Sequence, residues 1–228
     1  MIRRIGSDLE SFKTLDFGPG LNVLLADKSE GATDRQSRNG AGKTSFVDTV
    51  HFLTGGKAGP DSIFRSDELI NSTFDMQMDV GGDEITVERS GATPSKVYLN
   101  GPVEDWPIPP KFDEERGVFT LSNVNWTHSL GAKWFGLDAP PDTDIKFQPT
   151  FRSLFSYFAR RQSSGAFQAP TQQASMQFVW DQQVAISYLL GMDWTISQGF
   201  QGLREKEKVV KSLGKAARSG ELGPHFGR

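Results

Sequence analysis

The stretch SRNGAGKTSF, residues 37–46, has the composition of a loop that binds phosphate. Such a loop needs small residues that let consecutive backbone N–H groups point inward, followed by the N-terminus of a helix. Gly40 and Gly42 supply this backbone freedom, and Asn39 tolerates unusual backbone angles better than most side chains do. Ser37 stands where the usual pattern opens with a glycine, and a small serine can replace that glycine at modest strain.

Lys43 and Thr44 are the two side chains of this motif that carry chemistry. In a loop of this type the lysine reaches the β- and γ-phosphates of a nucleotide, and the threonine hydroxyl binds Mg²⁺. The sequence therefore predicts a site for ATP and Mg²⁺, with Thr44 as a metal ligand. The predicted nucleotide-binding residues are Asn39, Gly40, Ala41, Gly42, Lys43, Thr44 and Ser45. The alternative is a chance glycine-rich turn ahead of a helix.

The segments around the motif follow the order that such a site requires. LNVLLAD, residues 21–27, is an apolar run with the length and composition of a strand. Residues 44–53 carry apolar side chains at helical spacing, and Gly55–Gly56 marks a natural end for that helix. The expected local structure is a strand, then the loop, then a helix.

The rest of the chain divides into segments with strand-like and helix-like periodicity. Strands are expected at 2–9, 12–17, 73–80, 83–90 and 96–99, with Gly81–Gly82 as a hairpin turn. Helices are expected at 123–135, 149–162, 178–190 and from 194 onward. Pro149 is expected in the first turn of its helix, Gly191 ends the third helix, and Asp193 can cap the last. A loop rich in Gln, Ser and Gly is expected at 162–175.

The composition indicates a folded protein and excludes several kinds of chemistry. Of the 228 residues, 36% are apolar and 11% aromatic, which is enough for a packed core. The absence of cysteine excludes disulfides, thiolate metal sites and cysteine nucleophiles. A net charge of -3 gives no global attraction to nucleic acid. No segment reads as a signal peptide or a membrane span, so a soluble cytoplasmic protein with no membrane partner is expected.

Two quoted segments resemble a known family. SFKTLDFGPGLNVL (11–24) followed by NGAGKTSFVDTVHFL (39–53) resembles the N-terminal head segment of SMC-type ATPases, the ABC-like group that includes RecN and RecF. Phe12–Lys13 matches an aromatic–basic pair of that family, and 20–24 matches the strand before its loop. The insert ahead of the loop, with FRSLFSYFARR (151–161), resembles the SMC-like subunits of bacterial ABC three-component conflict systems. The resemblance covers most of the chain, but only the first fifty-odd positions are specific.

The resemblance implies a fold and further site residues. The implied fold is α/β: the N-terminal half of a P-loop NTPase head of the ABC/SMC type, with an antiparallel β subdomain. The implied domains are a lobe at 1–175 and, at 176–228, a helical arm that starts a coiled coil. In the family, a glutamine at the entry to the helical lobe contacts Mg²⁺. Gln162 is the best-placed candidate, with Gln148, Gln172 and Gln173 as alternatives. Lys13 is expected near the γ-phosphate, or else is a solvated surface lysine.

The parts that hydrolyse ATP in that family are missing from this sequence. No apolar strand ending in Asp–Glu follows the loop, so neither the carboxylate that binds Mg²⁺ nor the general base is supplied. LTGGK (53–57) imitates an ABC signature but directly follows the phosphate-loop helix, so it is interpreted as a helix end. ELGPHFGR (221–228) ends a charged helix. The chain is thus expected to be an N-terminal half, inactive alone, and an ATPase only when a C-terminal half completes it.

The expected partners are that C-terminal half and a second ATPase head in a dimer, together with DNA and other subunits of a repair or antiviral defence complex. The competing functions are a non-catalytic nucleotide-gated scaffold, a transporter-type nucleotide-binding subunit and a small-molecule kinase. The sequence lacks the signature of the transporter type and the lid residues of a kinase. Basic residues are concentrated in two parts of the sequence. The first group is Arg152, Arg160 and Arg161, and the second is Lys206, Lys208, Lys211, Lys215 and Arg218. The second set is interleaved with glutamates, which favours a solvated helix face over a DNA track.

Overall fold

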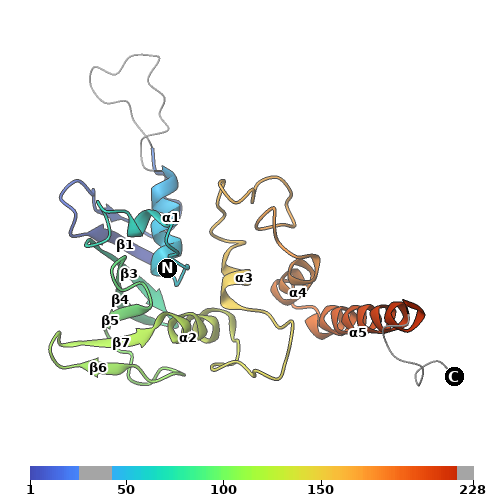
Figure 1. The fold of residues 1–228 in the computed structure, drawn as a ribbon. Helices are drawn as coiled ribbons and strands as arrows, with labels where there is room; N and C mark the ends of the chain where they lie inside the picture. Colours follow the sequence, from blue (N-terminus) through green and yellow to red (C-terminus); the bar gives the residue numbers. More distant parts are fainter. Residues whose placement is uncertain (26–42, 220–228) are drawn as a thin grey trace, which may run out of the picture. The chain divides into compact units, whose positions relative to one another are not determined.

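The computed structural model describes residues 1–25 and 43–219 (Figure 1). They form two compact units. The first consists of Met1–Asp142 and Thr150–Ser175, and the second of Thr143–Pro149 and Met176–Arg228. Within the described ranges, no helix combines the length and the apolar character that crossing a bilayer requires.

The first unit is built on one seven-stranded sheet with the strand order β2-β1-β3-β4-β5-β7-β6. The strands are β1 (Ile2–Ser7), β2 (Leu15–Asp16), β3 (Thr73–Val80), β4 (Asp83–Ser90), β5 (Lys96–Asn100), β6 (Lys111–Asp113) and β7 (Val118–Ser122). All neighbouring strands run antiparallel. The predicted hairpin is confirmed: Val80 pairs with Asp83, and Gly81 and Gly82 between them both have positive φ. A two-residue turn of this kind matches the twist of the strands, and glycine adopts it without strain.

The expected P-loop NTPase fold of the ABC/SMC type is contradicted by this sheet. That fold places its nucleotide loop after a strand of a parallel sheet, whereas the described strands make antiparallel pairs alone. The strand predicted at 21–27 is also wrong over its described part, 21–25, which has no strand pairing. Leu21 is 91% exposed and Leu25 80%. An apolar run becomes a strand when a neighbour satisfies its backbone N–H and C=O groups, and no described strand pairs with this segment.

The helical segments in the described part of the first unit are α1 (Lys43–Leu53), the 3-10 turn η2 (Ile63–Arg65), α2 (Asn123–Phe135) and α3 (Phe151–Phe155). Helix α1 ends where the sequence predicts, since Gly55 has a φ of 89° and its N–H bonds to the carbonyl of Phe52. Helix α2 has the predicted bounds. Ser122 accepts the N–H of Asn125 at its start, and Gly136 ends it in the left-handed conformation.

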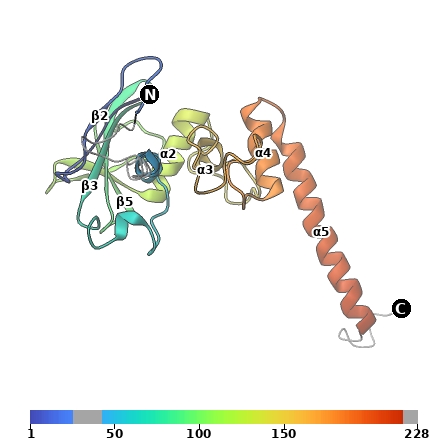
Figure 2. The same cartoon turned by 90° about the horizontal axis from the view of Figure 1, so that it is seen from above.

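The core lies between one face of the sheet and the helices α1 and α2 (Figure 2). Alternating residues of β3 and β4, such as Met76 and Val87, point into it because side chains of a strand alternate between faces. The indole of Trp126 on α2 is fully buried and donates a hydrogen bond to the carbonyl of Leu53 at 2.9 Å. This bond joins the C-terminal end of α1 to α2, beside the buried side chains of Val50, Phe52 and Leu53 that pack α1 into the core.

Helix α3 is much shorter than predicted. The periodicity favoured a helix over 149–162, but the helix covers Phe151–Phe155. Pro149 lies outside its first turn, because Thr150 is the N-cap and forms a capping box with Ser153. The residues that follow instead contact α1 through the Ala159 carbonyl and the Arg161 guanidinium. These tertiary contacts override the local helical pattern.

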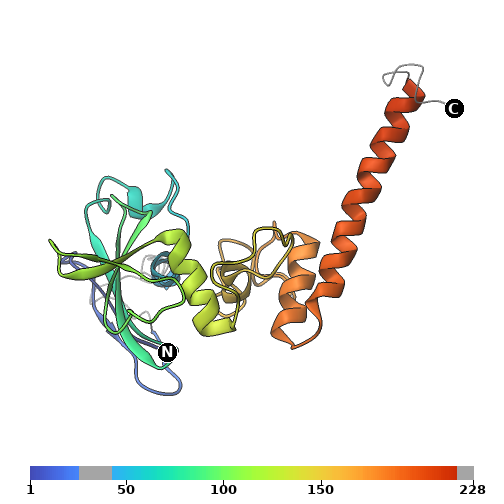
Figure 3. The same cartoon turned by 90° about the horizontal axis from the view of Figure 1, so that it is seen from below.

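The second unit consists of adjacent helices α4 (Val179–Leu189) and α5 (Trp194–Ser219) with the short segment 143–149 (Figure 3). The turn between the helices follows the predicted pattern: Gly191 has a φ of 69°, and Asp193 accepts the N–H of Thr195. Helix α5 has no buried residue. Its exposed apolar side chains are Ile196, Phe200, Leu203, Val209, Val210 and Leu213.

Candidate functional site

Most of the predicted phosphate loop lies outside the described residues. This holds for the insert 28–36 and for Ser37, Asn39, Gly40, Ala41 and Gly42. Lys43 is the first residue of α1, but its side chain also lies outside the described part. Thr44 and Ser45 are therefore the first residues of the motif whose side chains are described, and both are exposed at the N-terminal end of α1.

A cavity of about 500 Å³ lies beside the first two turns of α1. Thr44, Val47 and Asp48 line it from the helix. The segment 160–163 and Phe167, which follow α3, complete the lining. Thr44 and Asp48 are four residues apart, so they lie on the same face of α1. The cavity thus brings together Thr44 and Gln162, the two residues named as Mg²⁺ contacts from distant parts of the sequence.

The other glutamines and Lys13 lie elsewhere. Gln148 belongs to the second unit, where its amide donates to the carbonyl of Ile145. Gln172 and Gln173 follow the cavity-lining segment in the sequence and do not line the cavity. Lys13 is exposed between β1 and β2 and does not line it either. Among the four glutamine candidates, the geometry favours Gln162.

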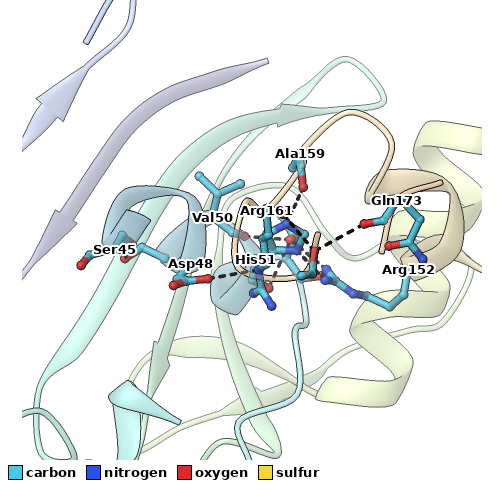
Figure 4. A network of polar contacts seen from close by, with 11 residues as sticks. Ser45, Asp48, Val50, His51, Arg152, Ala159, Arg161 and Gln173 are labelled. Atoms are coloured by element: carbon cyan, nitrogen blue, oxygen red, sulfur yellow. Dashed lines mark hydrogen bonds and ion pairs between the residues drawn. The ribbon is translucent and has the colours of Figure 1, made fainter. Parts of the chain in front are cut away.

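An ion pair crosses from α1 to the segment after α3. The Arg161 Nε lies 3.1 Å from the Asp48 Oδ1, and both side chains are only partly exposed (Figure 4). Burial lowers the pKa of Arg161, while the charge of Asp48 acts in the opposite direction. The same two residues also line a neighbouring cavity of about 350 Å³, together with Lys57, Asp61 and others. The pair therefore contributes to the lining of both cavities.

His51, one turn beyond Asp48 on α1, is buried and makes two short polar contacts (Figure 4). Its Nδ1 lies 2.6 Å from the Arg152 guanidinium, and its Nε2 lies 2.6 Å from the Ala159 carbonyl oxygen. A guanidinium only donates and a carbonyl only accepts, so Nδ1 accepts and Nε2 carries the proton. Burial, and then the charges of Arg152 and Arg161, lower the pKa of His51 to about 3. His51 is accordingly neutral, with one defined tautomer.

The surroundings of the cavity hold more positive than negative charge. Buried Arg89 donates to the main-chain carbonyls of Phe52, Gly56 and Pro94. Burial lowers the pKa of Arg89 and of Arg152 to about 10 in each case. Among the described residues that line the cavity, Asp48 is the one carboxylate and pairs with Arg161, while Arg160 adds a second positive charge. An anion in the cavity would therefore be stabilised by the local field.

Two of these residues were missed by the sequence interpretation. Asp48 carries a detectable signal, because it lies one helical turn after Thr44. His51 carries none, since its role depends on Ala159, which is distant in sequence. Arg152, Arg160 and Arg161, one of the two groups of basic residues noted in the sequence, each make contacts within the first unit. Arg160 donates to the carbonyls of Ala166 and Pro170.

The chemistry of the cavity lining is suited to a hard cation held together with an anion. Thr44, Asp48 and Gln162 present oxygen atoms, which Mg²⁺ prefers, and it commonly takes its remaining ligands from phosphate and water. Within the described ranges, no group of three or more His, Cys, Asp or Glu side chains could hold a metal alone. Comparison with protein-family models, curated proteins and solved structures finds no match.

Proposed function

We propose that this chain binds ATP as its Mg²⁺ complex at the N-terminal end of α1. The observation that carries the proposal is the convergence of Thr44 and Gln162 on one cavity. The sequence NGAGKT leads directly into this helix end. A helix N-terminus favours anions because its first N–H groups are free and its dipole is positive there.

Each residue has a distinct role in this proposal. Lys43 neutralises the β- and γ-phosphates, and the backbone N–H groups of 39–44 bind their oxygens. The Thr44 hydroxyl and the Gln162 amide oxygen are two Mg²⁺ contacts, and phosphate and water supply the others. The cation neutralises phosphate charge during phosphoryl transfer. Arg161 adds positive charge beside the cavity, where Asp48 balances it only in part.

Binding without turnover is the expected behaviour of the chain by itself. Hydrolysis needs a group that positions or deprotonates the attacking water. No apolar strand ending in Asp–Glu follows the phosphate motif in the sequence. We propose that the chain acts as the nucleotide-binding half of a cytoplasmic ATPase of a DNA-repair or defence complex, completed by a second half and a second head. The lack of a catalytic base also suits a nucleotide-gated scaffold.

The exposed segment 21–25 supports a completing partner. Leu21, Val23 and Leu25 are each more than two-thirds exposed. An exposed apolar segment that no described strand pairs with is suited to accept a strand from another polypeptide. Adding the second half, fused or in trans, should therefore protect the amides of 21–25 and allow ATP turnover. If protection appears without turnover, the scaffold function is favoured.

Nucleotide binding is tested by titrating a fluorescent ATP analogue into the purified chain with Mg²⁺. Lys43→Ala should weaken binding by about tenfold to a hundredfold, the size of a lost charged hydrogen bond. Lys208→Ala is the matched control, because it removes the same charge from exposed α5. Equal affinity of the wild type and Lys43→Ala would show that the phosphate loop is assigned wrongly.

A further inference from the structure

Two contacts hold the segment 159–161 against α1. Asp48 pairs with Arg161, and His51 donates to the carbonyl of Ala159. We propose that Asp48 and His51 are positioning residues that fix this segment so that Gln162, the next residue, lines the cavity beside Thr44. This inference rests on the proposed function and names the residues that assemble its Mg²⁺ contacts.

The predicted metal ligand and the two positioning residues all lie on helix α1. Thr44, Asp48 and His51 are separated by four and three residues, so they form one stripe along the helix. The stripe presents a predicted metal ligand first and the two anchoring side chains in the next turns. The anchors have a well-packed base, because buried Val50, Phe52 and Leu53 hold α1 in the core and the Leu53 carbonyl accepts a hydrogen bond from α2.

The anchored segment has little regular structure of its own to hold it. Helix α3 ends at Phe155, and residues 156–162 form turns and irregular backbone. The following loop is closed on itself: the Gly165 N–H bonds to the Gln162 carbonyl, and the Ala166 N–H to the Arg161 carbonyl. Both acceptors, the carbonyls of Arg161 and Gln162, belong to the anchored start of the loop, so these two hydrogen bonds require the start of the loop to be held in place.

His51 forms hydrogen bonds at both ends of the segment from Arg152 to Ala159, which leads to Gln162. Its Nδ1 accepts from Arg152, which lies in α3, and its Nε2 donates to Ala159. Arg152 also approaches the Thr54 hydroxyl and carbonyl just after α1. A glutamine can donate and accept in the same way without titrating, whereas a phenylalanine fills a similar space and can do neither. This pair of substitutions separates polar positioning from packing.

The first test needs no nucleotide and uses hydrogen exchange of the whole chain. Asp48→Asn and His51→Phe should each speed exchange of the Gly165 and Ala166 amides by about tenfold. Exchange in β3 and β4 should be unchanged, which excludes global unfolding. His51→Gln should restore protection. The control is Asp67→Asn, an equal charge change at an exposed position. Unchanged exchange at 165–166 in both variants would overturn the inference, whether or not ATP binds.

The second test asks whether Asp48 acts through Gln162. The quantity measured is the ratio of analogue affinities with Mg²⁺ and with EDTA. Gln162→Ala and Asp48→Asn should each lower this ratio by about fivefold to tenfold, the size of one ligand contact. The double variant should lower it no further, because the two residues act in series. Additive losses, or no loss with Gln162→Ala, would refute the positioning role. Failure of the wild type to bind ATP at all would refute the proposed function, and the exchange test then decides the positioning role.

Discussion

Neutral, buried His51 should make the protein sensitive to acid. Its pKa is about 3 in the folded chain and about 6.5 in the unfolded chain. Below pH 6.5 the unfolded state therefore binds more protons, and the free energy of unfolding falls by about 1.4 kcal/mol per pH unit. The contribution of neutral His51 to the free energy of unfolding is complete above pH 6.5 and is lost progressively as the pH falls towards 3. Between pH 7 and pH 4.5 the loss is about 3 kcal/mol.

The assay compares urea unfolding of the wild type and His51→Gln at pH 7 and pH 4.5. Glutamine can keep the bonds to Arg152 and Ala159 but does not titrate, so the wild type should lose about 3 kcal/mol more than the variant. His128 and the carboxylates are present in both proteins and cancel in the difference. If both proteins lost the same free energy of unfolding, His51 could not be neutral with both of its hydrogen bonds, to Arg152 and to Ala159, formed.

Three further predictions follow from the structure and the motif. Arg89→Leu should lower the free energy of unfolding by roughly 3 kcal/mol, because three main-chain carbonyls lose a buried charged donor. A decrease below about 1 kcal/mol, measured by urea unfolding, would contradict this prediction. The amides of helix α5 should exchange rapidly in the isolated chain, since none of its residues is buried. Strong protection from exchange along 194–219 would contradict the interpretation that α5 needs a partner helix to be stable. Ser37→Gly should leave analogue binding nearly unchanged, and a large loss would mean that the Ser37 hydroxyl contacts the ligand.

The candidate site could be predicted from the sequence only in part. The phosphate motif and its helix were visible because both are local patterns, and Gln162, which lines the cavity beside Thr44, was named as a candidate through a family resemblance. Asp48 lies one turn after Thr44 and could have been found from helical spacing alone. The function of His51 could not, because a buried histidine on an apolar helix face gives no signal until its partner from another segment is known.

The sequence by itself determined those elements whose cause is local. The hairpin of β3 and β4 follows from alternating side chains and a Gly–Gly turn, and the bounds of α2 follow from its serine cap and terminal glycine. Only the tertiary structure decided that 21–25 is not a strand, that α3 ends at Phe155, and that the described sheet is antiparallel. The physical reason is the range of the interactions. Turn angles, caps and periodicity act within a few residues, whereas strand pairing and the contacts of Asp48 and His51 depend on groups far away in the chain.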